Sequence, residues 1–184
     1  MPDVVGHSKP KYMKILFLFA CFVFNLSGYC QKEEIVLPQK DGKVVFDEIV
    51  VVDSINKDEL FKRAKLWIIN SFKSEKQVIT TDDKELGILK GSGIFSILTN
   101  QKVRFTFEIS VKDSKYKYAF YDFDYLNDYG NTSGINLEYY YDYYKSGKKM
   151  GIGRVKKYML ETKAYALFLS EEIKAAMKKA VADW

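Results

Sequence analysis

The alternation of apolar and polar residues predicts a run of β-strands in the middle of the chain. Every second side chain between residues 102 and 111 is apolar, namely Val103, Phe105, Phe107, Ile109 and Val111. Successive side chains of a strand point to opposite faces, so this pattern is typical of a strand with one buried and one wet face. Similar runs at 77–81, 85–98 and 116–125 are separated by short polar turns, which favours an antiparallel meander.

The segments on either side of this run predict one more strand and two helices. Residues 43–53, KVVFDEIVVVD, are β-branched and apolar, as in a largely buried strand. Asn56 and Glu59 then have the spacing of a capping box, and apolar residues recur at helical spacing as far as Phe72. A second helix is expected from about Val155, with Ser170 as a place where a new helix can begin.

These elements together predict an α+β fold. Its core is an antiparallel sheet of about five strands with two helices on one face, in the order β-α-β-β-β-β-α. Residues 31–42 are polar and predict a linker, and residues 43–184 predict a single domain, which is long enough to bury a sizeable core.

The first thirty residues have the layout of a secretory signal peptide. Lysines precede a 12-residue apolar run at 15–26, which is too short to span a bilayer comfortably. Gly28 and Cys30 supply small residues at the −3 and −1 positions of a cleavage site before Gln31. We therefore expect an exported protein, periplasmic or secreted, whose mature chain carries no transmembrane helix.

Two other interpretations of this segment stay open. Cys30 is also a candidate for the lipidated cysteine of an envelope lipoprotein, although Tyr29 is bulkier than the residue that usually precedes such a cysteine. The apolar run is also compatible with an uncleaved anchor. Met13, directly before the run, is a second candidate for the first residue.

Cleavage before Gln31 would restrict the chemistry of the mature chain. His7, Cys21 and Cys30 are the only histidine and the only cysteines, and all three precede the cleavage site. A chain without them cannot form a disulfide, a thiol nucleophile, a Ser-His pair or a zinc site of these residues. We therefore predict no catalytic residue, no metal site and no cofactor.

The charge of the chain gives no indication of a nucleic-acid partner. The chain has 29 Lys and Arg against 24 Asp and Glu, and residues 1–30 contain three of the lysines and one of the aspartates. The mature chain therefore carries a net charge of +3, which is too small for the electrostatic footprint of a nucleic-acid-binding protein.

Three segments resemble an uncharacterised domain family of Bacteroidota envelope proteins. They are VVVDSINKDELFKRAKLWIINSF at 50–72, DDKELGILKGSG at 82–93 and VKDSKYKYAFYDF at 111–123. The resemblance is strongest over 43–125. It implies a TATA-binding-protein-like fold whose element order agrees with the order predicted above. The matching motifs are structural, and a fold does not by itself imply a function, so the resemblance implies no activity and no DNA binding.

The stretch LEYYYDYYKSGKK at 137–149 is the best candidate for an interaction surface. One interpretation is an edge strand, because aromatic residues fit a half-buried pleated surface. The other is an exposed aromatic platform with a basic rim, suited to a glycan or an envelope protein. The predicted ligand-binding residues are Tyr139, Tyr140, Tyr141, Tyr143, Tyr144 and Lys145.

Acidic residues offer two weaker candidates. Asp122 and Asp124 run into an Asn- and Asp-rich loop that could supply oxygen ligands to calcium. The EF-hand spacing is absent, however, and the pattern is more typical of a solvated strand face that runs into an Asx-rich turn. Glu85, Glu108 and Glu138 could serve a hydrolase that uses carboxylates alone. We therefore predict a non-catalytic binding module of the cell envelope, with such a hydrolase or a ligand-free scaffold as alternatives.

Overall fold

A computed structural model describes residues 34–72, 78–97, 100–127 and 129–179 of the chain. The predicted signal peptide lies outside the described residues. The folded unit begins at Ile35.

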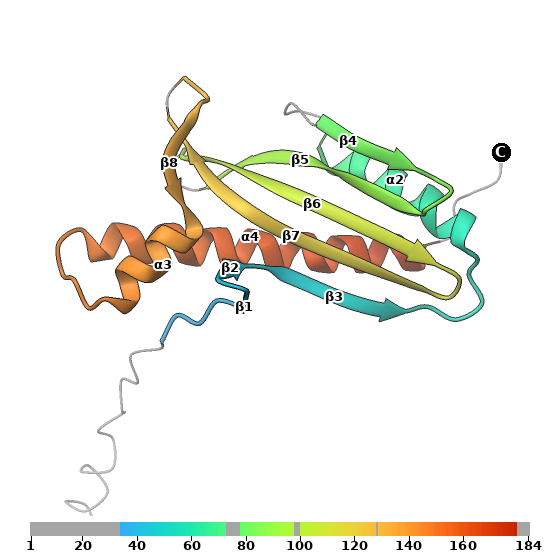
Figure 1. The fold of residues 1–184 in the computed structure, drawn as a ribbon, viewed down its shortest axis with the longest axis horizontal. Helices are drawn as coiled ribbons and strands as arrows, with labels where there is room; N and C mark the ends of the chain where they lie inside the picture. The colour runs from blue at the N-terminus through green and yellow to red at the C-terminus, as the bar shows by residue number, and fades with distance from the viewer. Residues whose placement is uncertain (1–33, 73–77, 98–99, 128, 180–184) are drawn as a thin grey trace, which may run out of the picture. The chain divides into compact units, whose positions relative to one another are not determined.

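An antiparallel sheet forms the centre of this unit (Figure 1). Its strands follow one another in the order β3-β7-β6-β5-β4, and β8 pairs with the end of β7 that β3 leaves free. The strands are β3 (Phe46–Val51), β4 (Val78–Asp83), β5 (Ile88–Ser96), β6 (Lys102–Lys112), β7 (Lys115–Leu126) and β8 (Thr132–Asn136).

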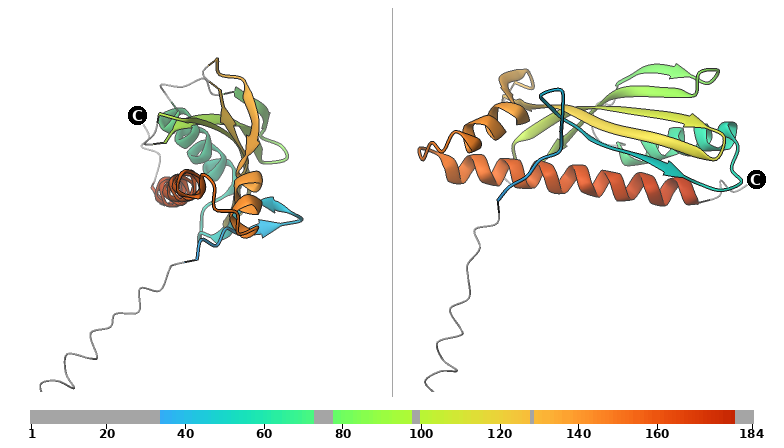
Figure 2. Two further views of the ribbon diagram at one scale, coloured as in Figure 1. Left: turned by 90° about the vertical axis from the view of Figure 1, so that its left-hand side faces the viewer. Right: turned by 60° about the horizontal axis from the view of Figure 1, so that its bottom comes forward.

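Two helices cover one face of the sheet, α2 (Lys57–Ser71) and α4 (Ile152–Lys178) (Figure 2). The predicted cap of α2 is confirmed, because the Asn56 side chain accepts a hydrogen bond from the Glu59 backbone N–H at 2.8 Å. No break occurs at Ser170, whose hydroxyl donates instead to the Ala166 carbonyl one turn earlier, at 2.9 Å. The predicted α+β fold with two helices on one face is confirmed.

The core lies between the sheet and these helices. All five apolar side chains of the β6 alternation are fully buried, as predicted. Trp67 of α2 lies 6.1 Å from Phe120 of β7 between ring centroids, and Phe105 stacks on Phe123 at 5.9 Å. Aromatic pairs at such separations add to the stabilisation from buried area.

The chain enters this core earlier than the sequence indicated. Ile35 and Leu37 are buried, and a two-stranded hairpin of β1 (Gln39–Lys40) and β2 (Lys43–Val44) follows them. The predicted linker at 31–42 therefore belongs largely to the domain. The physical reason is that burial of two apolar side chains two positions apart, Ile35 and Leu37, anchors an otherwise polar segment.

The Tyr-rich segment is a helix, so the predicted edge strand is wrong. It forms α3 (Leu137–Lys145), and the Asn136 side chain caps it by accepting from the Tyr139 backbone N–H at 2.8 Å. Leu137 and Tyr141, four residues apart, are buried together. Side chains four apart share a helix face, so burying this pair favours the helix over the weak strand preference of tyrosine.

Strand β7 contains a bulge at Asp122. Arg104 pairs with Asp124 and Thr106 with Tyr121, so two residues of β7 face one residue of β6. Asp122 occupies the extra position with φ of +52°, a left-handed conformation that Asp tolerates better than most residues. The inserted residue shifts the alternation of the strand, and both Asp122 and Asp124 therefore stay on the face away from the helices.

Candidate functional site

The sheet face opposite the helices is open and carries the candidate site. Figure 1 views this face, with α4 behind the sheet. An open groove of about 640 Å³ lies on it, where the β1–β2 hairpin and the start of α3 meet strands β6 and β7. The residues that line the groove are Gly42, Lys43, Arg104, Thr106, Asp122, Asp124, Asn136 and Glu138.

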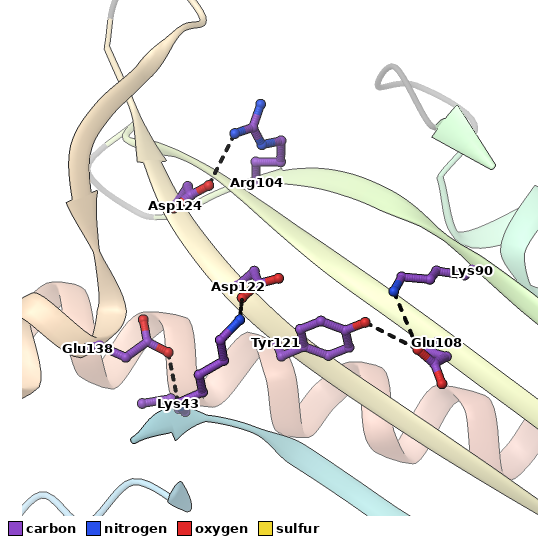
Figure 3. A network of polar contacts seen from close by, with 9 residues as sticks. Lys43, Lys90, Arg104, Glu108, Tyr121, Asp122, Asp124 and Glu138 are labelled. Carbon is purple, nitrogen blue, oxygen red and sulfur yellow. Dashed lines mark hydrogen bonds and ion pairs between the residues drawn. The ribbon is translucent and has the colours of Figure 1, made fainter. Parts of the chain in front are cut away.

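The hairpin places Lys43 beside the bulge of β7. Asp41 and Gly42 both have positive φ, 50° and 77°, which is the backbone of a tight two-residue hairpin turn. The Lys43 Nζ donates to Asp122 Oδ1 at 2.9 Å (Figure 3). This hydrogen bond raises the pKa of Lys43 above its ordinary value.

The sheet register places a second ion pair in the groove. Arg104 and Asp124 are cross-strand partners, and Arg104 Nη2 lies 3.1 Å from Asp124 Oδ2. Both side chains are partly exposed, so the pair leaves guanidinium and carboxylate surface available to a ligand.

The first turn of α3 contributes a third carboxylate. Glu138 Oε1 accepts from the backbone N–H of Val44 at 2.7 Å and thereby links α3 to strand β2. Asn136, which caps this helix, lines the same groove. The groove therefore depends on segments more than ninety residues apart in the sequence.

A shallower hollow of about 310 Å³ continues along the same face. Tyr121 and Ala119 lie in it, and the Tyr121 hydroxyl donates to Glu108 Oε2 at 3.2 Å. Lys90 approaches the same carboxylate at 3.7 Å and lies 5.7 Å from the centroid of the Tyr121 ring (Figure 3). The open face therefore offers an aromatic side chain next to a strongly polar groove.

The charges in the main groove nearly balance. Two cations and three carboxylates line it. Each carboxylate already has a partner within the protein, either a hydrogen-bond donor or a cation. Among the residues that the structure describes, no group of three or more His, Cys, Asp and Glu side chains is arranged to hold a metal ion. The groove therefore offers a ligand several hydrogen-bond donors and acceptors in fixed positions.

Three of the predicted tyrosines pack against other parts of the domain. Tyr141 is buried, and Tyr140 makes an edge contact with the buried ring of Tyr125 at 4.8 Å between centroids. The Tyr144 hydroxyl accepts from the Ile35 backbone N–H at 3.2 Å. These side chains fasten α3 to the core and to the beginning of the domain.

The remaining predicted residues are more accessible. Tyr139 is 55% exposed, whereas the Tyr143 hydroxyl donates to the Met150 carbonyl in the loop that follows the helix. Lys145 Nζ lies 4.4 Å from the centroid of the Tyr141 ring. Of the six predicted residues, Tyr139 and Lys145 are exposed, and the centroid of the Tyr139 ring lies 6.0 Å from that of Tyr140. The role of these residues as a ligand site stays a prediction.

Sequence reasoning singled out some groove residues but did not bring them together. The sequence offers Asp122 and Asp124 as calcium candidates and Glu138 as a hydrolase candidate, while no sequence signal points to Lys43 or Arg104. One signal was present in the sequence. Buried aromatic residues of β7 alternate as far as Phe120 and then resume three positions later, which is the spacing that a bulge produces.

The architecture defines an α+β protein of the TBP-like class, an antiparallel sheet with its helices on one face. Residues 46–126 match the model of a family described as "Domain of unknown function (DUF4468) with TBP-like fold". The resemblance to this family is thus confirmed over these residues. The matched residues run from β3 to β7 and leave out the β1–β2 hairpin, α3 and α4.

Two solved structures are similar to the chain in fold. A TBP-like protein from Parabacteroides distasonis has a TM-score of 0.66 and 18% identity, over 79% of this chain and 99% of that one. A DUF4468 family protein from Bacteroides ovatus has a TM-score of 0.63 and 18% identity, over 80% and 94%. At this identity the likeness concerns the fold alone. No curated protein matches the chain.

The helices α2, α3 and α4 lie within the residues that the structure describes. In this part of the chain no helix combines the length and the apolar character that crossing a bilayer requires.

Proposed function

We propose that this protein is an exported cell-envelope protein that binds a carbohydrate in the groove of the open sheet face without transforming it. The observation that carries the proposal is the convergence of charged and amide side chains from the hairpin, β6, β7 and the start of α3 around one cavity. The volume of about 640 Å³ lies in the usual range for small-ligand sites.

The chemistry of the lining favours a sugar over a charged ligand. Each sugar hydroxyl both donates and accepts, so it is best met by donors and acceptors set close together. The ion pairs Lys43–Asp122 and Arg104–Asp124 provide this arrangement twice. A phosphate or sulfate would meet three carboxylates in the groove, and a polycation would meet two fixed positive charges. Tyr121, in the adjoining hollow, offers a ring face to a neighbouring sugar.

Export is supported by the layout of the first thirty residues. Their apolar run and small residues before Gln31 are typical of a cleaved secretory signal, and Cys30 keeps the lipoprotein alternative open. Mass spectrometry of the N-terminus of the protein from its native cell tests this part. A free Gln31 agrees with soluble export, a lipid on Cys30 with an anchored lipoprotein, and an intact residue 1–30 segment contradicts export by cleavage.

The binding part is tested with the chain from Gln31 onward. It is screened on a glycan array, and hits are measured by calorimetry with two groove variants, Arg104→Ala and Asp122→Asn. Each removes a charge-assisted hydrogen bond, so we expect affinity to fall about tenfold or more. The matched control is Asp58→Asn. Asp58 is an exposed residue of α2 that forms an ion pair with Lys84, so this variant should bind like the wild type. Equal binding by all variants contradicts the groove as the site.

A hydrolase is the second candidate, because Asp122, Asp124 and Glu138 line one groove. Glycosidases use two carboxyl groups that flank the scissile bond. Incubating the array hits with the protein and analysing them by mass spectrometry separates the two functions. Shortened products that disappear with Glu138→Gln indicate hydrolysis, and unchanged oligosaccharides agree with binding alone. No binding to any glycan would leave the scaffold as the better description.

A further inference from the structure

The outer face of α4 carries a row of apolar side chains that no function described above uses. Leu160 and Leu167 are each 49% exposed and Phe168 is 54% exposed, although all three are large and apolar. They lie on the side of the helix opposite its buried stripe, and the exposed Ala164 lies between them. Figure 2 shows α4 at the outside of the domain, with the sheet and α2 to one side of it.

We propose that a second copy of this chain packs antiparallel on this face, with the two-fold axis at Ala164. Around this residue the outer face of α4 is symmetric in spacing: Leu160 and Phe168 lie four residues on either side. An antiparallel partner would therefore place Leu160 of one copy against Phe168 of the other, twice. The small side chain at the axis allows the two helices to approach closely.

Charge complementarity supports this occupant and this register. Lys157 and Glu171 lie seven residues on either side of Ala164, on the same outer face, with side chains 54% and 75% exposed. The two-fold axis brings Lys157 of each copy to Glu171 of the other. A parallel pair would instead bring Lys157 to Lys157 and Glu171 to Glu171, which is repulsive.

The size of the contact predicts a weak dimer. A helix of 27 residues is about 40 Å long, and only one of its faces takes part. One helix pair buries less than the roughly 800 Å² per partner of a standard interface, so we expect a dissociation constant on the order of tens of micromolar.

Sedimentation equilibrium of the chain from Gln31 tests the contact. Either single variant, Lys157→Glu or Glu171→Lys, breaks both symmetric ion pairs and should weaken the dimer about tenfold. The double variant restores both pairs with reversed charges and should recover wild-type affinity. Leu160→Glu should abolish the dimer, and Leu86→Glu, an exposed leucine in the turn before β5, is the control that leaves it intact. A wild-type chain that remains monomeric at about 0.5 mM, or a double reversal no better than the singles, overturns the proposal.

Oxidative cross-linking tests the register independently. The chain from Gln31 has no cysteine, so an introduced one reports only its own neighbours. Ala164→Cys lies on the axis and should form an intermolecular disulfide. Leu160→Cys should not, because its two copies would be about 12 Å apart along the helices. Cross-linking of Leu160→Cys with itself but not of Ala164→Cys overturns the antiparallel register.

Discussion

Replacing Tyr116 with phenylalanine is expected to stabilise the protein. Tyr116 lies at the start of β7 and is almost fully buried, and its hydroxyl has no hydrogen-bond partner among the described residues. Burial raises its pKa to about 12. A buried hydroxyl without a partner costs about 1–3 kcal/mol, so its removal should increase the free energy of unfolding by about 1 kcal/mol after partial compensation by packing.

The same substitution at Tyr125 should have the opposite effect. The Tyr125 hydroxyl shares a hydrogen bond of 2.9 Å with Thr162 Oγ1, and both residues are buried. Tyr125→Phe leaves the threonine hydroxyl alone in the core and should cost about 1–2 kcal/mol. The double variant Tyr125→Phe/Thr162→Val removes both partners and should lie closer to the wild type than either single variant does.

Urea unfolding, followed by the fluorescence of the buried Trp67 and by circular dichroism, measures these differences. A change of 1 kcal/mol moves the melting temperature by about 2–4 °C in a protein of this size, and the denaturant slope should stay constant. If Tyr116→Phe destabilises the protein as much as Tyr125→Phe does, the Tyr116 hydroxyl has a partner and the reasoning is refuted.

The pH dependence gives a second measure of the same group. The folded pKa of Tyr116 lies above that of an unfolded tyrosine, so its contribution to stability is complete below pH 10 and is lost as the pH rises from about 10 to about 12. Tyr116→Phe should therefore unfold less readily in alkali than the wild type. An identical alkaline profile of both proteins would show that the residue does not titrate as expected.

Three further substitutions test local features of the fold. Gly87→Ala should destabilise the protein by about 2 kcal/mol or more, because φ is +71° and a Cβ would lie 2.6 Å from the Val111 carbonyl oxygen. Thermal melting measures the loss, and an unchanged melting temperature contradicts the prediction. Asn56→Ala should cost about 1 kcal/mol in urea unfolding by loss of the helix cap, whereas Asn56→Asp should be nearly neutral. The hydrogen bond from Lys174 lowers the pKa of Glu48 in the folded protein. The pair therefore stabilises the fold above the ordinary glutamate pKa near 4.5, and this contribution is lost as the pH falls through the lower folded pKa. Glu48→Gln should lower the free energy of unfolding by less than about 1 kcal/mol at pH 7 and leave it unchanged at low pH.

The parts of the fold that the sequence predicts are those set by local patterns. The alternation in β6 and the cap at Asn56 each need only neighbouring residues, and both are present as expected. The order of strands and helices follows from the same signals. The alternation of a strand and the cap of a helix each relate residues two to four positions apart, so a short stretch of sequence is enough to predict them.

The parts that the sequence did not predict depend on contacts between distant segments. Tyrosines favour strands by propensity, but α3 forms because Leu137 and Tyr141 are buried against the rest of the domain. The groove requires Lys43 to reach Asp122, 79 residues away, and no spacing rule indicates that pair. A candidate site of this kind becomes visible only when the strand register is known.

Asp122 links the fold to the proposed site, and substitutions there can separate its two roles. Asp122→Gly keeps the left-handed backbone at φ of +52° and should leave stability equal or slightly higher, while Asp122→Val should destabilise by about 1–2 kcal/mol because a β-branched residue is strained there. Both variants lose the partner of Lys43 and, under the proposed function, should bind the ligand equally weakly, because both lack the carboxylate that lines the groove. Deleting Asp122 should remove the bulge and restore a regular alternation, because Phe123 would then follow Tyr121 directly and would stay on the buried face with Tyr125. Urea unfolding and calorimetry of the three variants measure the two roles, and a glycine variant that loses stability, or that still binds at full affinity, contradicts this assignment.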